Sequence, residues 1–228
     1  MLFQIIPQNP NPREKYQKTV EDLCILLANK KGQNYRTGVF VLLTLSGNQY
    51  QRQAKKYRFS HFKDSIEARR FLKNFQADVT ALKIVYELNV VYSNSDADEI
   101  DHLRGAILEV FSYLICNKLF TISDKEVQIQ IGKWISSTSI DSAGCSDKKG
   151  CCFQGKASSE WWHSIEEQGY DLKQIENLTS GKALGAFITF ESAEVFQQHL
   201  IAKGLNQEDY RVFGRYQMAE FEKSCSAS

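Results

Sequence analysis

The segments after residue 95 alternate between helical and strand-like patterns, and this order limits the possible folds more than any other feature of the sequence. Residues 96–119 read as a helix, and a strand with apolar residues at every second position follows around Val127, Ile129 and Ile131. The later segments are a strand at 137–142, a loop at 143–150, a strand at 151–158, a helix at 159–178, a strand at 185–190, a helix at 192–203 and a strand at 210–216. The order αβββαβαβ predicts an α/β fold.

The first 94 residues have a different character. Residues 13–30 form an amphipathic helical pattern, and a helical pattern returns from about residue 64 to 92. The apolar run at 38–45 is consistent with either a buried strand or a buried helix. A polar, turn-like stretch at 93–98 separates this part from the rest. We therefore predict a mainly helical domain at 1–94 and an α/β domain at 95–228.

Charge divides the chain at the same place, although the formal net charge is only +1. Residues 1–94 hold 15 Lys and Arg against 7 Asp and Glu, whereas the rest of the chain is acidic. The basic residues gather at 49–75, where aromatic residues lie between them; they include Arg52, Lys55, Lys56, Arg58, Arg69 and Arg70. This composition suits contact with a phosphate backbone and stacked bases. The alternatives are docking on the acidic half of the chain or on an acidic protein partner.

Several classes of protein are disfavoured. No apolar run approaches the roughly 18 residues of a membrane span, and the first residues do not resemble a signal peptide, so we expect a cytoplasmic protein with no membrane partner. The six cysteines contain no CxxC pair. Cys145, Cys151 and Cys152 lie close together in sequence, but small side chains in a hairpin explain them better than a zinc site. A phosphate-binding loop of the GxxxxGK[ST] type is absent from the sequence.

Glu109 is the only charged residue between Arg104 and Lys118 on the helix expected at 96–119. Small residues surround it on its own face, and apolar residues occupy the opposite face, so the helix reads as covered on most sides. A carboxylate in such surroundings needs a partner, because desolvating a lone charge is costly. The sequence leaves open whether this partner is a metal ion, a basic side chain or a ligand.

The hairpin supplies a second set of polar residues. Side chains alternate along a strand, so Gln154 and Lys156 share one face of the strand expected at 151–158. Pairing with the preceding strand would bring Asp141 beside them. A carboxylate, an amide oxygen and an ammonium would then meet at one edge of the sheet.

A helix Glu, an Asp, about a dozen residues and then a short motif ending in Lys resemble the PD-(D/E)XK nuclease superfamily, which has the restriction-endonuclease-like fold. The matching residues are Glu109, Asp141 and Gln154-Gly155-Lys156, and the resemblance covers about residues 96–220. It implies an αβββαβαβ nuclease core following the basic N-terminal domain, and a metal-dependent endonuclease acting on DNA more than on RNA. By the same resemblance, Glu109, Asp141, Gln154 and Lys156 would be catalytic.

The resemblance also implies that Asp141, Gln154 and Glu109 bind Mg²⁺ or Mn²⁺. Lys156 would then orient the attacking water or stabilise the transition state. Ser158 would contact a phosphate, and a homodimer would be plausible. The family usually has an acidic residue where this chain has Gln154, and a neutral oxygen binds magnesium more weakly. A catalytically inactive nuclease-fold protein that binds nucleic acid or a partner protein is the alternative hypothesis.

Overall fold

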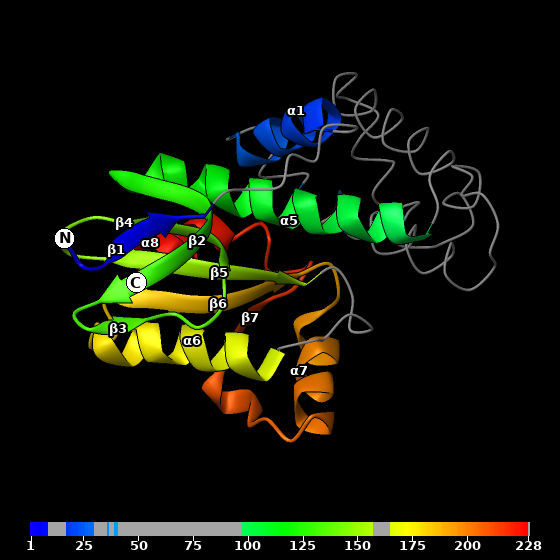
Figure 1. The fold of residues 1–228 in the computed structure, drawn as a ribbon. Helices are drawn as coiled ribbons and strands as arrows, with labels where there is room; N and C mark the ends of the chain where they lie inside the picture. Colours follow the sequence, from blue (N-terminus) through cyan, green and yellow to red (C-terminus); the bar gives the residue numbers. More distant parts are fainter. Residues whose placement is uncertain (9–16, 30–35, 37–38, 41–96, 157–164, 228) are drawn as a thin grey trace, which may run out of the picture.

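The computed structural model describes residues 1–8, 17–29, 36, 39–40, 97–156 and 165–227. In these ranges one mixed sheet is covered by helices on both faces (Figure 1). The strands are β1 (Gln4–Pro7), β2 (Ile122–Ile131), β3 (Trp134–Ile135), β4 (Ile140–Cys145), β5 (Gly150–Lys156), β6 (Ala183–Thr189) and β7 (Arg211–Phe213). The helices are α1 (Gln17–Ala28), α5 (Ala97–Leu119), α6 (Ile165–Leu178), α7 (Ala193–Ala202) and α8 (Phe221–Ala227), with a short 3-10 helix at Gln207–Asp209.

The strand order is β1-β2-β4-β5-β6-β7, and β3 also pairs with β2. The pairs from β1 to β5 are antiparallel, whereas β6 runs parallel to both β5 and β7. Parallel neighbours need a crossover connection, and α6 and α7 supply the two crossovers. The predicted α/β class is confirmed.

Two apolar cores lie on the two faces of the sheet. One is formed by α1, α5 and α8 against one face, and the other by α6 and α7 against the opposite face (Figure 1). Phe111 and Phe153 belong to the first core, and Leu172 and Phe187 belong to the second. Apolar side chains therefore fill the interior, and no helix of the described ranges is long and apolar enough to cross a bilayer.

Strand β6 is the most deeply buried part of the sheet. All seven of its residues are buried, as expected for a strand with parallel neighbours and helices on both faces. Its small residues let α6 approach closely: a Cβ atom on Gly185 would lie 2.5 Å from the carbonyl oxygen of Leu172. Strand β6 thus anchors the parallel half of the sheet, next to the strand that carries Gln154 and Lys156.

The segments expected after residue 95 are present, with different ends in several cases. The loop expected at 143–150 is wrong, because β4 continues to Cys145 and β5 begins at Gly150, which leaves a turn of four residues. Gly144 and Gly150 read as turn residues, yet they are buried strand positions where a Cβ atom would meet Phe120 and Phe3. Strands β1 and β3 and helix α8 were not predicted from the sequence.

The described segments before residue 41 pack with the rest of the sheet. Strand β1 pairs antiparallel with β2, with Ile5 opposite Ile129. Helix α1 packs on α5, and Leu23 and Phe40 lie in the same core as Phe111. These segments therefore share the core of the α/β part. Residues 41–94, the larger share of the expected N-terminal domain, lie outside the described residues, and the two-domain division stays a prediction.

Candidate functional site

The antiparallel pairing of β4 and β5 brings the start of one strand beside the end of the other. Ser142 pairs with Phe153 in this register. Asp141 therefore lies near Gln154 and Gly155, although they are separated by a hairpin in sequence. The sequence-based expectation that Asp141 and Gln154 meet at the sheet is borne out by direct hydrogen bonds between the two residues and their neighbours.

The side chain of Gln154 is locked between two backbone groups. The backbone N–H of Asp141 donates to Oε1 of Gln154 at 3.1 Å, and Nε2 of Gln154 donates to the carbonyl oxygen of Ser139 at 3.1 Å. Gln154 is only 2% exposed. Both ends of its amide therefore bond to backbone groups of the segment from Ser139 to Asp141, and the amide has one favourable orientation.

The carboxylate of Asp141 is held in a similar way. The backbone N–H of Gly155 donates to Oδ2 of Asp141 at 2.6 Å, a short bond to a carboxylate. A Cβ atom placed on Gly155 would lie 3.2 Å from this oxygen and 3.0 Å from Cβ of Leu108. The absence of a side chain at Gly155 therefore leaves the space that the carboxylate and α5 occupy.

Lys156 is the last residue of β5 and is partly buried. Burial lowers the pKa of its ammonium below the usual range, and the negative charge of Asp141 acts in the opposite direction. Burial is the larger of the two effects. Lys156 follows Gln154 by two residues along β5, and the charge of Asp141 partly offsets the effect of burial on the pKa of Lys156.

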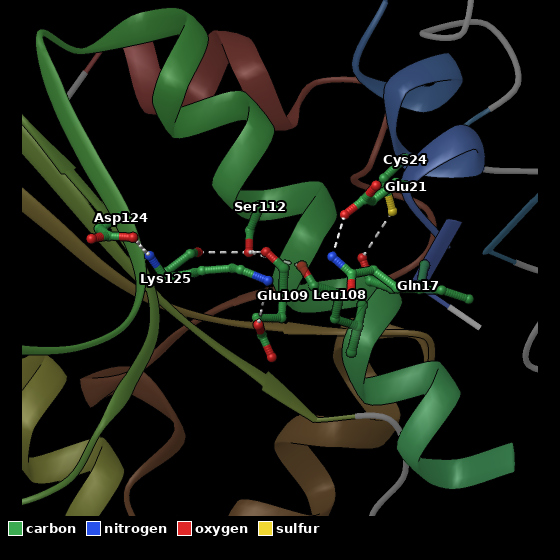
Figure 2. Close-up of polar contacts among 10 residues, drawn as sticks. Gln17, Glu21, Cys24, Leu108, Glu109, Ser112, Asp124 and Lys125 are labelled. Carbon is green, nitrogen blue, oxygen red and sulfur yellow. Dashed lines mark hydrogen bonds and ion pairs between the residues drawn. The ribbon is translucent and has the colours of Figure 1, made fainter. Parts of the chain in front are cut away.

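Glu109 lies on α5 and is 6% exposed. Nζ of Lys125, from β2, lies 3.5 Å from Oε1 of Glu109 and forms an ion pair with it (Figure 2). Lys125 is the kind of partner that a buried carboxylate requires, since an unpaired charge in the interior is costly. Of the partners that the sequence left open, the structure shows a basic side chain beside Glu109.

Contacts on either side of Glu109 lead to the two strands of the site. Leu108 lies beside Gly155, as the built Cβ distance shows. One turn later, Ser142 donates a hydrogen bond of 2.6 Å to the hydroxyl of Ser112. Glu109 follows Leu108 and precedes Ser112 on the same helix, so α5 presents it beside the strands that carry Asp141 and Gln154.

The donor atoms of the site are hard oxygens, which suit magnesium or manganese. Asp141 contributes a carboxylate and Gln154 an amide oxygen with a second lone pair. No group of three His, Cys, Asp or Glu side chains that could hold a metal ion occurs among the described residues. Magnesium commonly binds through one or two carboxylates together with water and substrate phosphate, and the donors present fit that mode.

The remaining site residues expected from the sequence cannot be placed. The basic residues Arg52, Lys55, Lys56, Arg58, Arg69 and Arg70, and also Ser158, lie outside the described residues. Cys145, Cys151 and Cys152 are fully buried, and burial raises the pKa of their thiols. They behave as small apolar side chains of the hairpin, as the sequence indicated.

Asp171 of α6 supports the site and was not singled out in the sequence. It is fully buried and accepts hydrogen bonds from the backbone N–H of Ser137 at 3.1 Å and of Thr138 at 2.7 Å. The hydroxyl of Thr138 donates to it at 2.8 Å. Asp171 therefore holds the segment that ends at Ser139, whose carbonyl anchors Gln154. An acidic residue within an otherwise apolar helical face was the signal available in the sequence.

Comparison with known proteins adds little. No family model matches this chain, and no curated protein matches it. Among solved structures, a crystal structure of protein VC1899 from Vibrio cholerae is similar, with a TM-score of 0.40 and 12% sequence identity. The match covers 96% of this chain, and the chain spans 57% of the length of that protein. A similarity of this degree assigns neither a family nor an activity to the chain.

Proposed function

We propose that this protein is a metal-dependent nuclease that hydrolyses phosphodiester bonds, in DNA more than in RNA. The observation that carries the proposal is the hydrogen bonding of Asp141 to Gln154 and Gly155 where β4 begins and β5 ends, with Lys156 as the next residue of β5. A carboxylate and an amide oxygen beside an ammonium make a site that suits a divalent cation together with an anionic substrate.

Each residue has a distinct task in this proposal. Asp141 and Gln154 would bind Mg²⁺ or Mn²⁺, which when bound lowers the pKa of a water ligand and offsets phosphate charge. Lys156 would hold the attacking water or stabilise the charge that develops on the phosphate. The Gly155 N–H keeps the Asp141 carboxylate in one orientation. Glu109, also expected to bind the metal, is paired with Lys125 here.

The preference for DNA is an expectation from the nuclease resemblance and from the basic run at 49–75. Lys and Arg interleaved with aromatic residues suit a phosphate backbone and unstacked bases. If this run binds the substrate, affinity should fall steeply as salt rises, because each phosphate contact releases counterions.

The test is cleavage of plasmid DNA in Mg²⁺ or Mn²⁺ by the full chain and by Asp141→Ala and Lys156→Ala. Loss of cleavage in both variants is expected. The matched controls are Asp147→Ala and Lys133→Ala, exposed residues of the β4–β5 turn and the β2–β3 turn. If the wild-type chain cleaves neither DNA nor RNA in either metal, or if both site variants cleave at the wild-type rate, the proposal is wrong.

A second candidate is a catalytically inactive protein that retains the fold and binds nucleic acid. Two contacts favour it: both ends of the Gln154 amide are engaged with the backbone, and Glu109 is paired with Lys125. The same preparations distinguish the two candidates by gel mobility. Retarded DNA without cleavage in either metal would support the inactive protein, whereas metal-dependent products lost in Asp141→Ala would support the enzyme.

A further inference from the structure

Strand β2 changes face between Lys125 and Val127. Val127 and Ile129 pack into the core on the α6 and α7 side of the sheet. Residues two apart in a regular strand share a face, yet Lys125 reaches Glu109 on α5, on the other side. The intervening Glu126 has φ of 50°, a conformation that residues other than glycine rarely adopt. Glu126 thus reorients the strand and directs Lys125 toward α5.

Strand β4, which pairs with β2, changes face at the residues opposite Lys125 and Val127. Lys125 pairs with Ser142 and Val127 with Ile140. Ile140 packs in the same core as Val127, whereas Ser142 bonds to Ser112 on α5. Asp141 lies between Ile140 and Ser142, so it belongs to the segment in which β4 changes face. Local distortions of this kind re-aim side chains beside functional sites, and strained conformations persist only where the surroundings hold them.

Two carboxylates beside this distortion are each accompanied by an amine. Glu109 and Asp141 are two carboxylates, and Lys125 and Lys156 are two amines on the strands beside them. The charge of one divalent cation would then be enough to offset the charge of one bound phosphodiester. A second divalent cation would have to bind to Glu109 beside the ammonium of Lys125. The two positive charges would then repel each other, which disfavours binding of the second cation.

We infer, on the basis of the proposed function, that Lys125 is a positioning residue that holds Glu109 as its counter-ion and thereby limits the site to one divalent cation. Glu109 is then a charged neighbour of the site rather than a metal ligand. Lys125 takes over the neutralisation of Glu109 that a second metal ion would otherwise supply.

The experiment is a titration of the full-length protein with Mn²⁺ alone, followed by calorimetry and by the spin-resonance signal of unbound Mn²⁺. The wild-type chain should bind one Mn²⁺. Lys125→Met should bind a second Mn²⁺, because Glu109 loses its counter-ion. Lys125→Arg keeps the charge and should restore the wild-type result. Lys173→Met, which removes an exposed lysine paired with Asp209 on the α6 side, is the control.

A second variant tests the inference without relying on the folding of Lys125→Met, which circular dichroism would check. Glu109→Gln should still bind one Mn²⁺, with an affinity lowered by no more than about tenfold because the ammonium of Lys125 then lacks its counter-ion; complete loss of binding would make Glu109 a ligand and overturn the inference. Two Mn²⁺ in the wild-type chain, or a folded Lys125→Met that still binds only one Mn²⁺, would also overturn it while leaving the proposed nuclease intact. A wild-type chain that binds no Mn²⁺ would overturn both.

Discussion

Gln154 holds the backbone of Asp141: its Oε1 accepts the Asp141 N–H at 3.1 Å, while its Nε2 donates to the carbonyl of Ser139 two residues earlier. The site thus has an amide at this position rather than a carboxylate. An amide both donates and accepts, whereas an ionised carboxylate only accepts. The geometry of the segment from Ser139 to Asp141 therefore gives a physical reason for glutamine at this position.

Gln154→Glu should destabilise the fold by about 1–3 kcal/mol at pH 7, because an ionised carboxylate would face the Ser139 carbonyl without a proton to donate. The pKa of the new carboxyl should be raised, so the loss should be largest above that raised pKa. The loss should shrink as the pH falls and the group is protonated in the folded state. Urea unfolding at several pH values measures this.

The matched control is Gln128→Glu on β2. Gln128 also donates to a carbonyl, that of Ser136, but it is only partly buried, so water can compensate for the lost donor. Its loss of stability should be smaller and should vary less with pH. Equal losses in the two variants would contradict the role assigned to the Gln154 amide.

Lys156→Met should increase stability by about 0.5–2 kcal/mol at neutral pH, because burial disfavours the charged amine. A lysine with a lowered pKa in the folded state binds fewer protons there than when unfolded. The wild-type chain should therefore gain stability as the pH rises from that lowered pKa toward the unfolded value near 10.4. The difference in free energy of unfolding between Lys156→Met and the wild-type chain should therefore decrease over that pH range.

Chemical unfolding of both proteins from pH 7 to pH 10, with cleavage measured in parallel, tests this behaviour. We expect cleavage to be lost while stability rises. A variant that is less stable than wild type at neutral pH would show that Lys156 contributes a stabilising contact rather than an ammonium kept for function.

Gly155→Ala should disturb the site directly. The new Cβ would lie 3.2 Å from Oδ2 of Asp141 and 3.0 Å from Cβ of Leu108, closer than side chains ordinarily pack. We expect a loss of about 1–3 kcal/mol in the free energy of unfolding and a roughly tenfold to hundredfold slower cleavage, since small displacements of catalytic groups are costly.

Gly105→Ala is the comparison for this change, because a Cβ at Gly105 on α5 meets nothing within 4 Å. Alanine favours a helix interior by about 0.5–1 kcal/mol over glycine, so this variant should be more stable than wild type. Thermal melts should show a lower melting temperature than wild type for Gly155→Ala and a higher one for Gly105→Ala, and plasmid cleavage should be slower in Gly155→Ala than in Gly105→Ala. Similar melting temperatures and cleavage rates in the two variants would refute the steric argument.

Asp171→Ala should cost about 2–4 kcal/mol, because it leaves the N–H groups of Ser137 and Thr138 and the Thr138 hydroxyl without their buried acceptor. Asp171→Asn should lose less, since its amide oxygen still accepts. Asp22→Ala, which breaks an exposed pair with Lys18, should have a much smaller effect. Urea unfolding separates these cases, and a loss for Asp171→Ala no larger than for Asp22→Ala would contradict the assignment.

Much of the fold after residue 95 was predictable from periodicity. The helix expected at 96–119 is α5 at Ala97–Leu119, and the strand expected at 185–190 is β6 at Ala183–Thr189. Both have strong local patterns, an apolar helical face in one and a continuous apolar run in the other. The approach of Asp141 to Gln154 followed from the hairpin, because sequence-adjacent strands usually pair.

Elements that depend on distant partners were missed. Strand β1 has four residues and exists because it pairs with β2, more than a hundred residues later. The true hairpin turn was obscured because Gly144 and Gly150 resemble turn residues. Their small size instead accommodates Phe120 and Phe3 against the sheet.

The sequence by itself predicted the main helices and strands after residue 95 and the approach of Asp141 to Gln154, because those follow from local patterns and the pairing of neighbouring strands. Only the tertiary structure decided what accompanies Glu109. Lys125 lies in a segment that reads as a regular strand, and regular alternation would put it on the face of Val127. The positive φ of Glu126 reverses that assignment, and a glutamate adopts such a conformation only where the surrounding structure holds it.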